Sequence, residues 1–423
     1  MTVQAENPLA ENPQADTALA DTPLALYIHW PFCRAKCPYC DFNSHVAQQI
    51  DHARFAAAYR REMAYMAAQY GAGRRLVSVF FGGGTPSLMP PSLVAGILDD
   101  AAQYFGLSDD VEITAEANPT SSEAATFAGF RAAGVNRISL GVQSLRDTGL
   151  AFLGREHDVA DARAAITMAQ RSFTRTSIDL IYARHDQTPA DWEAELREAL
   201  DLGLTHMSLY QLTIEPGTVF HTRSRRGARL IPPDDQAAEM YEVTGDIMTG
   251  AGLPAYEISN HAAAGEMCRH NLVYWRAQDW IGIGPGAHGR LTVPAEGPAG
   301  GSGGGPGESS GDGPGDRLGL ATRRSPAAWL ETVEANGHAI ESVIEDDRGD
   351  AVAECLMMGL RLAEGVSLPA MEARFGPRGG WLDEAALSGF VTSGRMEISD
   401  GHLRTTPAGR LLLDGILAEI LSP

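Results

Sequence analysis

The sequence is short of cysteine, of basic residues and of long apolar stretches, and each shortage excludes a class of protein. Only 5 of its 423 residues are cysteine, too few for a disulfide-stapled scaffold and typical of a reducing compartment. Lys and Arg number 33 against 54 Asp and Glu, so the net charge is −21 and nucleic-acid binding is not expected. No apolar stretch is long enough to span a membrane. We therefore expect a cytoplasmic protein, which could also lie peripherally at the inner face of a membrane.

The composition divides the chain into four parts. Residues 1–22 lack the basic start and apolar core of a signal peptide and are predicted to be a disordered leader. Residues 297–315 are dominated by Gly with Pro, Ser and Asp, so we expect a flexible linker over residues 294–324. These boundaries leave a large domain at 23–293 and a smaller one at 325–423.

Short apolar runs alternate with longer amphipathic segments in the large domain. The strands are predicted at residues 24–30, 76–81, 111–116, 137–140, 176–181 and 206–212. The helices are predicted at 54–70, 91–104, 122–133, 159–170 and 189–202. This alternation predicts an α/β fold, a partial (β/α)6 barrel or a strongly curved parallel sheet with helices outside it. In such folds the functional residues gather at the carboxyl ends of the strands.

The last part of the chain changes its pattern. Helices are expected at residues 351–362, 368–375 and 381–388, a hairpin at 396–405, and a closing helix at 408–421. Helices followed by a hairpin suggest a small winged-helix-like α+β domain. Because the chain is acidic, we interpret this domain as a packing or partner module rather than a DNA reader.

Three of the five cysteines lie together after the first predicted strand, with the spacing C-x3-C-x2-C. They are Cys33, Cys37 and Cys40. A structural zinc ion requires four ligands, so a zinc site would also need His29, Asp41 or His45. A four-iron cluster held by three cysteines instead keeps one iron open to another ligand. The place of the cysteines at a strand end favours the open cluster.

Polar and glycine residues follow the other predicted strands. Gly82-Gly83-Gly84-Thr85-Pro86 follows the second strand and, taken alone, is an ordinary tight turn. Glu116, Gln143, Arg155 and Asp179 lie at or just past the third to fifth strands. Each alone would be interpreted as a cap or a surface ion pair. Together they form an arc of donors and acceptors suited to a ribose, an amine and a carboxylate.

The cysteine spacing, with Tyr39 before the last cysteine, resembles the radical S-adenosylmethionine (SAM) family. The resemblance implies a [4Fe–4S] cluster on the three cysteines, with SAM bound to the open iron and cleaved by an electron from the cluster. From about Leu24 to the C-terminus, the chain resembles one subfamily more specifically, the oxygen-independent coproporphyrinogen III oxidases and their relatives. Matching positions there bind SAM, which implies the following residues here: Tyr27, Phe42, Gly83, Gly84, Thr85, Glu116, Gln143, Arg155 and Asp179.

The chain departs from those oxidases at two places. The oxidases carry a fourth cysteine two residues after the third, where this chain has Phe42. Relatives also have a Gly-Leu-Pro-Gly-Gln-Thr type turn after the fifth strand, where this chain has Ala183-Arg184-His185-Asp186-Gln187-Thr188. We expect Arg184 and His185 to crowd the rim of the sheet there.

A downstream string, residues 268–275, contains the pattern His-Asn-x-x-Tyr-Trp. A lone histidine among aromatics is usually a packed core residue, but imidazole is also a common axial ligand of heme. The pattern resembles the heme-chaperone branch of the same subfamily. The resemblance implies that heme is bound by His270, Asn271, Tyr274 and Trp275, with Cys268 as an alternative thiolate ligand. Cys355 is interpreted as core packing.

The implied function is therefore that of a heme chaperone. It would bind heme, a [4Fe–4S] cluster and SAM, and would pass heme to an acceptor hemoprotein, for example one of respiration. A flavodoxin or ferredoxin would donate the electron. The enzyme alternative is oxidative decarboxylation of coproporphyrinogen III to protoporphyrinogen IX, against which Phe42 counts. A third alternative is a zinc protein without redox chemistry.

Overall fold

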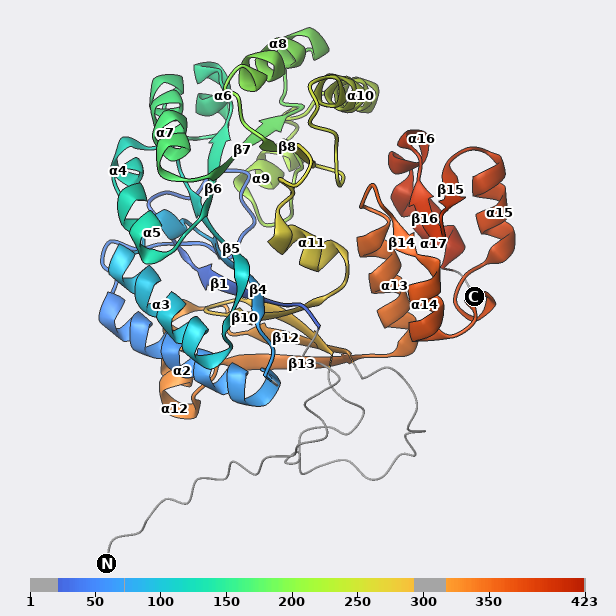
Figure 1. Ribbon diagram of the computed structural model, residues 1–423. Coiled ribbons are helices and arrows are strands. Elements are labelled where there is room, and N and C mark those ends of the chain that lie inside the picture. The colour runs from blue at the N-terminus through green and yellow to red at the C-terminus, as the bar shows by residue number, and fades with distance from the viewer. Residues whose placement is uncertain (1–21, 72, 293–316, 422–423) are drawn as a thin grey trace, which may run out of the picture.

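A single large sheet forms the centre of the molecule. The structure, a computed structural model, describes residues 22–71, 73–292 and 317–421. The sheet has 11 strands in the order β13-β12-β11-β10-β1-β4-β5-β6-β7-β8-β9 (Figure 1). Its strands are β1 (Leu24–Trp30), β4 (Leu76–Gly83), β5 (Leu107–Ala117), β6 (Arg137–Gln143), β7 (Arg175–Tyr182), β8 (His206–Gln211), β9 (Asn260–Ala262), β10 (Asp279–Ile283), β11 (His288–Thr292), β12 (Arg317–Thr322) and β13 (Ile340–Asp346).

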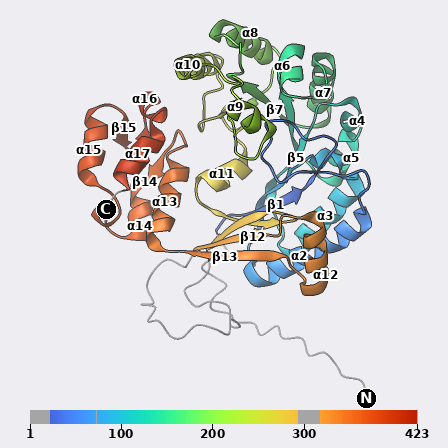
Figure 2. The ribbon, with the colours of Figure 1, turned by 180° about the vertical axis from the view of Figure 1, so that it is seen from behind.

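The strands from β1 to β8 run parallel and curve into a partial barrel with helices outside it (Figures 1 and 2). β1 is buried on both faces, as a helix-covered parallel strand must be, which explains its continuous apolar sequence. The outer helices are α2 (His52–Tyr70), α3 (Pro91–Tyr104), α4 (Ser121–Ala124), α5 (Phe127–Ala133), α6 (Asp147–Phe152), α7 (Val159–Ser172), α8 (Pro189–Leu200) and α10 (Asp234–Gly250). The short helix α9 (Val219–Arg225) instead lies against the loop after β1, where the Phe220 N–H donates to the Pro38 carbonyl at 2.9 Å. The predicted partial (β/α)6 barrel is confirmed.

One predicted helix, at residues 122–133, is divided into α4 and α5. The Glu123 side chain accepts a hydrogen bond from the Asn118 backbone N–H at 2.8 Å, and the Thr126 hydroxyl donates to the Glu123 carbonyl at 2.7 Å. Such local side-chain bonds compete with the helical ladder. The closing helix is also divided, into α16 (Pro407–Arg410) and α17 (Leu413–Ile420).

The sheet extends further than the sequence predicted. Residues 317–346, expected in the linker and the C-terminal domain, supply β12, the helix α12 (Pro326–Asn336) and β13. β12 and β13 continue the large sheet in antiparallel pairs beyond β11, and α12 lies beside α2. The change from the large sheet to the C-terminal domain thus falls near residue 346 rather than 325. The leader up to residue 21 and the linker residues 294–316 lie outside the described residues.

The C-terminal domain packs a short antiparallel sheet against helices. Its strands, in the order β14-β16-β15, are β14 (Val366–Ser367), β16 (His402–Thr405) and β15 (Met396–Ser399). Its helices are α13 (Arg348–Gly359), α14 (Leu368–Phe375), α15 (Glu384–Thr392), α16 and α17. This arrangement confirms the winged-helix-like domain, with the hairpin at the predicted residues. Within the described parts of the chain, no helix is long and apolar enough to cross a membrane.

A buried carboxylate, Glu62 on α2, joins the late sheet extension to the barrel. It accepts hydrogen bonds from the Gly284 N–H at 2.8 Å, the Ala339 N–H at 3.0 Å and the Trp329 indole N–H at 3.0 Å. Burial raises the pKa of Glu62 to about 7. All three partners are donors, and they contact both carboxyl oxygens, so each of the two oxygens must act as an acceptor.

We expect Glu62→Gln to lower the free energy of unfolding by about 1–3 kcal/mol, because the amide NH2 would face a donor in either orientation. Urea unfolding followed by circular dichroism measures the loss. Glu193→Gln is the matched control, since Glu193 forms an exposed pair with Arg197 at 2.7 Å and should change stability by less than about 1 kcal/mol. Equal effects of the two substitutions would contradict the assignment.

Candidate functional site

The three clustered cysteines line one cavity at the carboxyl ends of the parallel strands. They lie in the loop after β1, which is held by the short parallel pair β2 (Phe32–Cys33) and β3 (His45–Val46). The cavity has a volume of about 150 Å3. Its walls include all three cysteines and eight of the residues predicted to bind SAM: Phe42, Gly83, Gly84, Thr85, Glu116, Gln143, Arg155 and Asp179. The fold thus brings together residues that the sequence spreads over 147 positions, from Cys33 to Asp179.

The glycine turn after β4 has a steric reason for its composition. A Cβ atom on Gly84 would lie 2.7 Å from the Phe32 carbonyl oxygen, and one on Gly83 would lie 2.6 Å from the His29 ring. Gly83 also has φ of 112°, which favours glycine. The Thr85 N–H donates to the Phe32 carbonyl at 2.8 Å, and the Thr85 hydroxyl donates to the Cys33 Sγ at 3.3 Å. The turn therefore packs directly against the cysteine loop and opens its backbone to the cavity.

Arg155 connects the cysteine loop to the opposite wall of the cavity. Its guanidinium donates to the Cys37 Sγ at 3.3 Å, to the Asn118 Oδ1 at 2.5 Å and to the Gly141 carbonyl at 2.9 Å. Asn118 in turn donates to the Thr85 hydroxyl at 3.3 Å. These contacts fix the position of the Cys37 sulfur relative to the opposite wall of the cavity. Arg155 was predicted from the sequence as a site residue, but Asn118 was not. Its position at a strand end, two residues after Glu116, could have indicated it.

Two buried carboxyl groups, Glu116 and Asp179, give the cavity its acidic side. Burial and the neighbouring charge of Asp179 raise the pKa of Glu116 to about 8. Burial also raises the pKa of Asp179, which accepts a hydrogen bond from the Ser139 hydroxyl at 3.1 Å. Such a pair is suited to a ligand with positive charge, because a cation would offset the cost of ionising the two groups. Gln143, between them, has φ of 67°, a strained conformation often found at binding sites.

The cysteine geometry fits a cluster better than a single ion. Among the residues that the structure describes, no three His, Cys, Asp or Glu side chains come close enough together to hold one metal ion. The Nε2 atoms of His29 and His45 lie 2.9 Å from the Asn43 carbonyl oxygen and 3.2 Å from the Asn43 Oδ1, respectively. A four-iron cluster places each cysteine on a different iron and needs no fourth protein ligand. The three cysteines and the open cavity beside them have the composition that such a cluster with an external ligand requires.

Of the expectations about the rim, that for Arg184 needs correction, whereas that for Tyr27 stays a prediction. Arg184 does not crowd it, because its side chain is buried and pairs with Glu195 at 2.7 Å, and residues 183–186 are not part of the cavity wall. Tyr27, predicted to bind SAM, does not line the cysteine cavity. It lines a neighbouring cavity, and its hydroxyl is 3.1 Å from the His29 Nδ1. The two cavities share Phe42, Gly83 and Glu116.

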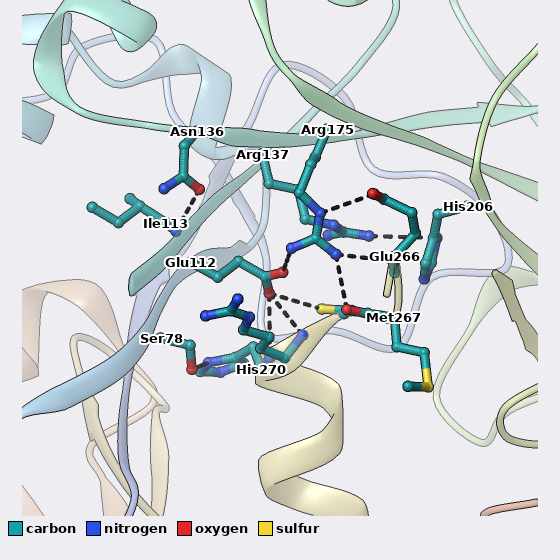
Figure 3. Close-up of polar contacts among 12 residues, drawn as sticks. Ser78, Glu112, Ile113, Asn136, Arg137, Arg175, His206, Glu266, Met267 and His270 are labelled. Atoms are coloured by element: carbon teal, nitrogen blue, oxygen red, sulfur yellow. Dashed lines mark hydrogen bonds and ion pairs between the residues drawn. The ribbon is translucent and has the colours of Figure 1, made fainter. Parts of the chain in front are cut away.

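The downstream string forms the short helix α11 (Arg269–Trp275), whose first turn is held by a carboxylate of β5 (Figure 3). Glu112 accepts hydrogen bonds from the N–H groups of Arg269 at 2.9 Å and His270 at 3.3 Å. The same carboxylate pairs with Arg175, which also donates to the Met267 carbonyl at 2.9 Å. Glu112 and Arg175 therefore fix both the start of α11 and the segment before it.

His270 has a different role from the one predicted. Its ring is 1% exposed, with Nδ1 2.9 Å from the Ser78 hydroxyl and Nε2 2.7 Å from the Tyr274 hydroxyl. Burial lowers the pKa of His270 to about 3. Both ring nitrogens are used, so His270 as it lies cannot bind iron. Cys268 is also buried, with its Sγ 3.5 Å from Glu112, and burial raises its pKa to about 12.

The other residues of the 268–275 segment do not share one site. Tyr274 reaches the neighbouring cavity, where its ring meets that of Trp280 at 4.6 Å. Trp275 packs under the guanidinium of Arg361, which lies 5.3 Å from its ring centre and just past α13 in the C-terminal part of the chain. Asn271 is half-buried on α11. Of the residues predicted to bind heme, only Tyr274 therefore lines a cavity next to the cysteine site.

Comparisons with known proteins agree with this architecture. The family described as the Radical SAM superfamily matches residues 27–199, and the HemN C-terminal domain matches residues 346–412. The heme chaperone HemW of Escherichia coli is 36% identical over 94% of this chain and 98% of its own length. HemW of Mycobacterium tuberculosis is 40% identical over 94% of both chains. The mitochondrial radical S-adenosyl methionine domain-containing protein 1 of Bos taurus is 37% identical over 94% of this chain and 87% of its own.

Among solved structures, the coproporphyrinogen III oxidase HemN of Escherichia coli, a radical SAM enzyme, has the same fold. The TM-score is 0.76, with 96% of this chain and 91% of that chain covered, at 21% sequence identity. This likeness extends through the barrel and the C-terminal domain.

Proposed function

Because this chain belongs to the HemW family of radical SAM proteins, we propose that it is a heme chaperone that binds heme beside an iron–sulfur cluster and passes it to an acceptor hemoprotein. The observation that carries the proposal is the open three-cysteine cavity with an aromatic cavity directly beside it. A hemoprotein of respiration as the acceptor and a flavodoxin or ferredoxin as electron donor are parts of the same proposal.

Cys33, Cys37 and Cys40 would hold the cluster, and SAM would occupy the rest of their cavity. When bound, the cluster supplies the electron for reductive cleavage of SAM. Arg155 orients Cys37, and the turn at Gly83 and Gly84 lies close to the cysteine loop because it carries no side chains. Glu116 and Asp179 offer carboxylates to the amine and the ribose of the cofactor. The contacts and charges of the cavity wall support these roles.

The rival function, oxidative decarboxylation of coproporphyrinogen III, differs in its product. Phe42 stands where the oxidases have a fourth cysteine, and 59% of its side chain is exposed in the cavity wall. We expect anaerobic incubation of the reconstituted protein with coproporphyrinogen III, SAM and reductant to give no protoporphyrinogen IX by chromatography. The same preparation should bind added hemin. Formation of protoporphyrinogen at enzymatic rates would contradict the proposal.

A further inference from the structure

A second cavity, here called the aromatic cavity, lies beside the cysteine cavity and has a volume of about 390 Å3. Its walls include four aromatic side chains, two histidines, an arginine and a carboxyl group. These residues are Tyr27, Phe42, Tyr274, Trp280, His29, His288, Arg324 and Glu116. Flat aromatic walls with imidazole groups and a cation suit a planar, largely apolar ligand that carries carboxylate groups.

The aromatic cavity contains one histidine that is free to bind a metal. His29, which also lines it, is occupied by the Tyr27 hydroxyl at 3.1 Å and the Asn43 carbonyl at 2.9 Å. His288 is exposed at the start of β11, and its ring nitrogens have no hydrogen bond to any residue that the structure describes. Partial burial and the nearby Arg290 and Arg324 lower the pKa of His288, which keeps the imidazole in the neutral, metal-binding form.

The surroundings of His288 are held in place before any ligand binds. The Trp280 indole N–H donates to the His288 carbonyl at 3.1 Å, which keeps the tryptophan ring beside the histidine backbone. The Asn43 side chain donates to the carbonyls of Pro285 and Arg324, both at 2.9 Å. The loop before His288 and the Arg324 backbone are therefore tied to the cysteine loop. A ligand in this cavity would lie next to the cluster cavity, with which it shares Glu116, Phe42 and Gly83.

We propose that heme binds in the aromatic cavity and that His288 is its axial ligand, with Arg324 available to a propionate. The inference rests on the proposed function and gives it a site. It assigns His270 the part of a positioning residue, since the hydrogen bond of 2.7 Å from its ring to the Tyr274 hydroxyl holds that aromatic wall in place.

The test uses the reconstituted full-length protein with two probes, hemin and iron-free protoporphyrin IX. His288→Ala should lower the affinity for hemin by about tenfold or more and shift the Soret band, because the iron loses its protein ligand. Its affinity for protoporphyrin IX should be unchanged, since that ring has no iron to ligate. Trp280→Ala should lower the affinity for both hemin and protoporphyrin IX, because the substitution removes one aromatic wall of the cavity. His402→Ala, at a histidine on β16 of the C-terminal domain, is the control and should change neither.

The outcomes separate this inference from the proposed function. If the wild-type protein binds no hemin, both fail. If the wild type binds hemin and His288→Ala binds it with the same affinity and spectrum, only the assignment of His288 fails. His270→Ala provides a second check. It should keep the Soret position of the wild type, and loss of that spectrum in His270→Ala together with its retention in His288→Ala would overturn the assignment.

Discussion

Replacing Cys37 by alanine is expected to leave the protein without its iron–sulfur cluster after anaerobic reconstitution. The wild type should carry about four iron atoms per chain with matching sulfide, and the variant close to none. In the proposed cluster each cysteine would bind its own iron, so the loss of one cysteine leaves a second iron without a protein ligand. Cys37 is the most informative of the three, because Arg155 donates to its sulfur at 3.3 Å. Iron and sulfide analysis, with the visible absorption spectrum, measures the effect.

Cys355→Ala is the matched control for this experiment. Cys355 is buried on α13, away from the cavity, and its sulfur accepts only a contact of 3.4 Å from Arg374 among the described residues. The control should retain the iron, the sulfide and the brown colour of the wild type. Full iron content in Cys37→Ala, or stoichiometric zinc in the wild type, would contradict the cluster assignment.

Replacing Glu112 by alanine is expected to lower the free energy of unfolding by about 3–5 kcal/mol, because buried donors lose their acceptor. The substitution leaves two N–H groups of α11 without an acceptor and removes one of the two carboxylate partners of Arg175, which keeps its pair with Glu266 (Figure 3). The start of α11 should loosen with it, and so should the wall that Tyr274 gives to the aromatic cavity. Urea unfolding of the cluster-free protein, followed by circular dichroism, measures the loss.

Asp110→Ala provides the comparison for Glu112. Asp110 lies on the same strand and contacts the same helix, since it pairs with the Arg269 guanidinium at 2.7 Å, but its side chain is 73% exposed. An exposed pair contributes about 0–1 kcal/mol, so this variant should remain close to the wild type. If the two substitutions lowered stability equally, burial would not be the reason for the effect of Glu112.

The parts of the fold that could be predicted are those that local sequence determines. β1 is an unbroken apolar run because the parallel sheet is covered on both faces, and α3 begins and ends where its apolar period does. The cysteine cavity was also predictable, because parallel strands bring the residues at their carboxyl ends to one rim. The positions of Gly83, Glu116, Gln143 and Asp179 follow from that rule alone.

The rest depends on contacts between distant parts of the chain. β12 joins the sheet by pairing with β11, and β13 joins it by pairing with β12. Glu62 accepts a hydrogen bond from the Ala339 N–H, 277 positions away in the sequence. The same is true of α11. Glu112 holds its first turn from another strand, and this placement turns His270 into the interior and Tyr274 toward the cavity. A motif read along the sequence shows which residues are present but not which of them face the ligand.

Hemin titration of the reconstituted wild-type protein, read by absorbance with and without SAM, tests the central claim most directly. We expect a saturable Soret change on a protein that already shows cluster absorption, and heme should stay with the protein through gel filtration. After SAM is added, the cluster should remain intact, and its absorption should shift because SAM binds the open iron. A protein with an intact cluster that shows no saturable hemin binding would contradict the account.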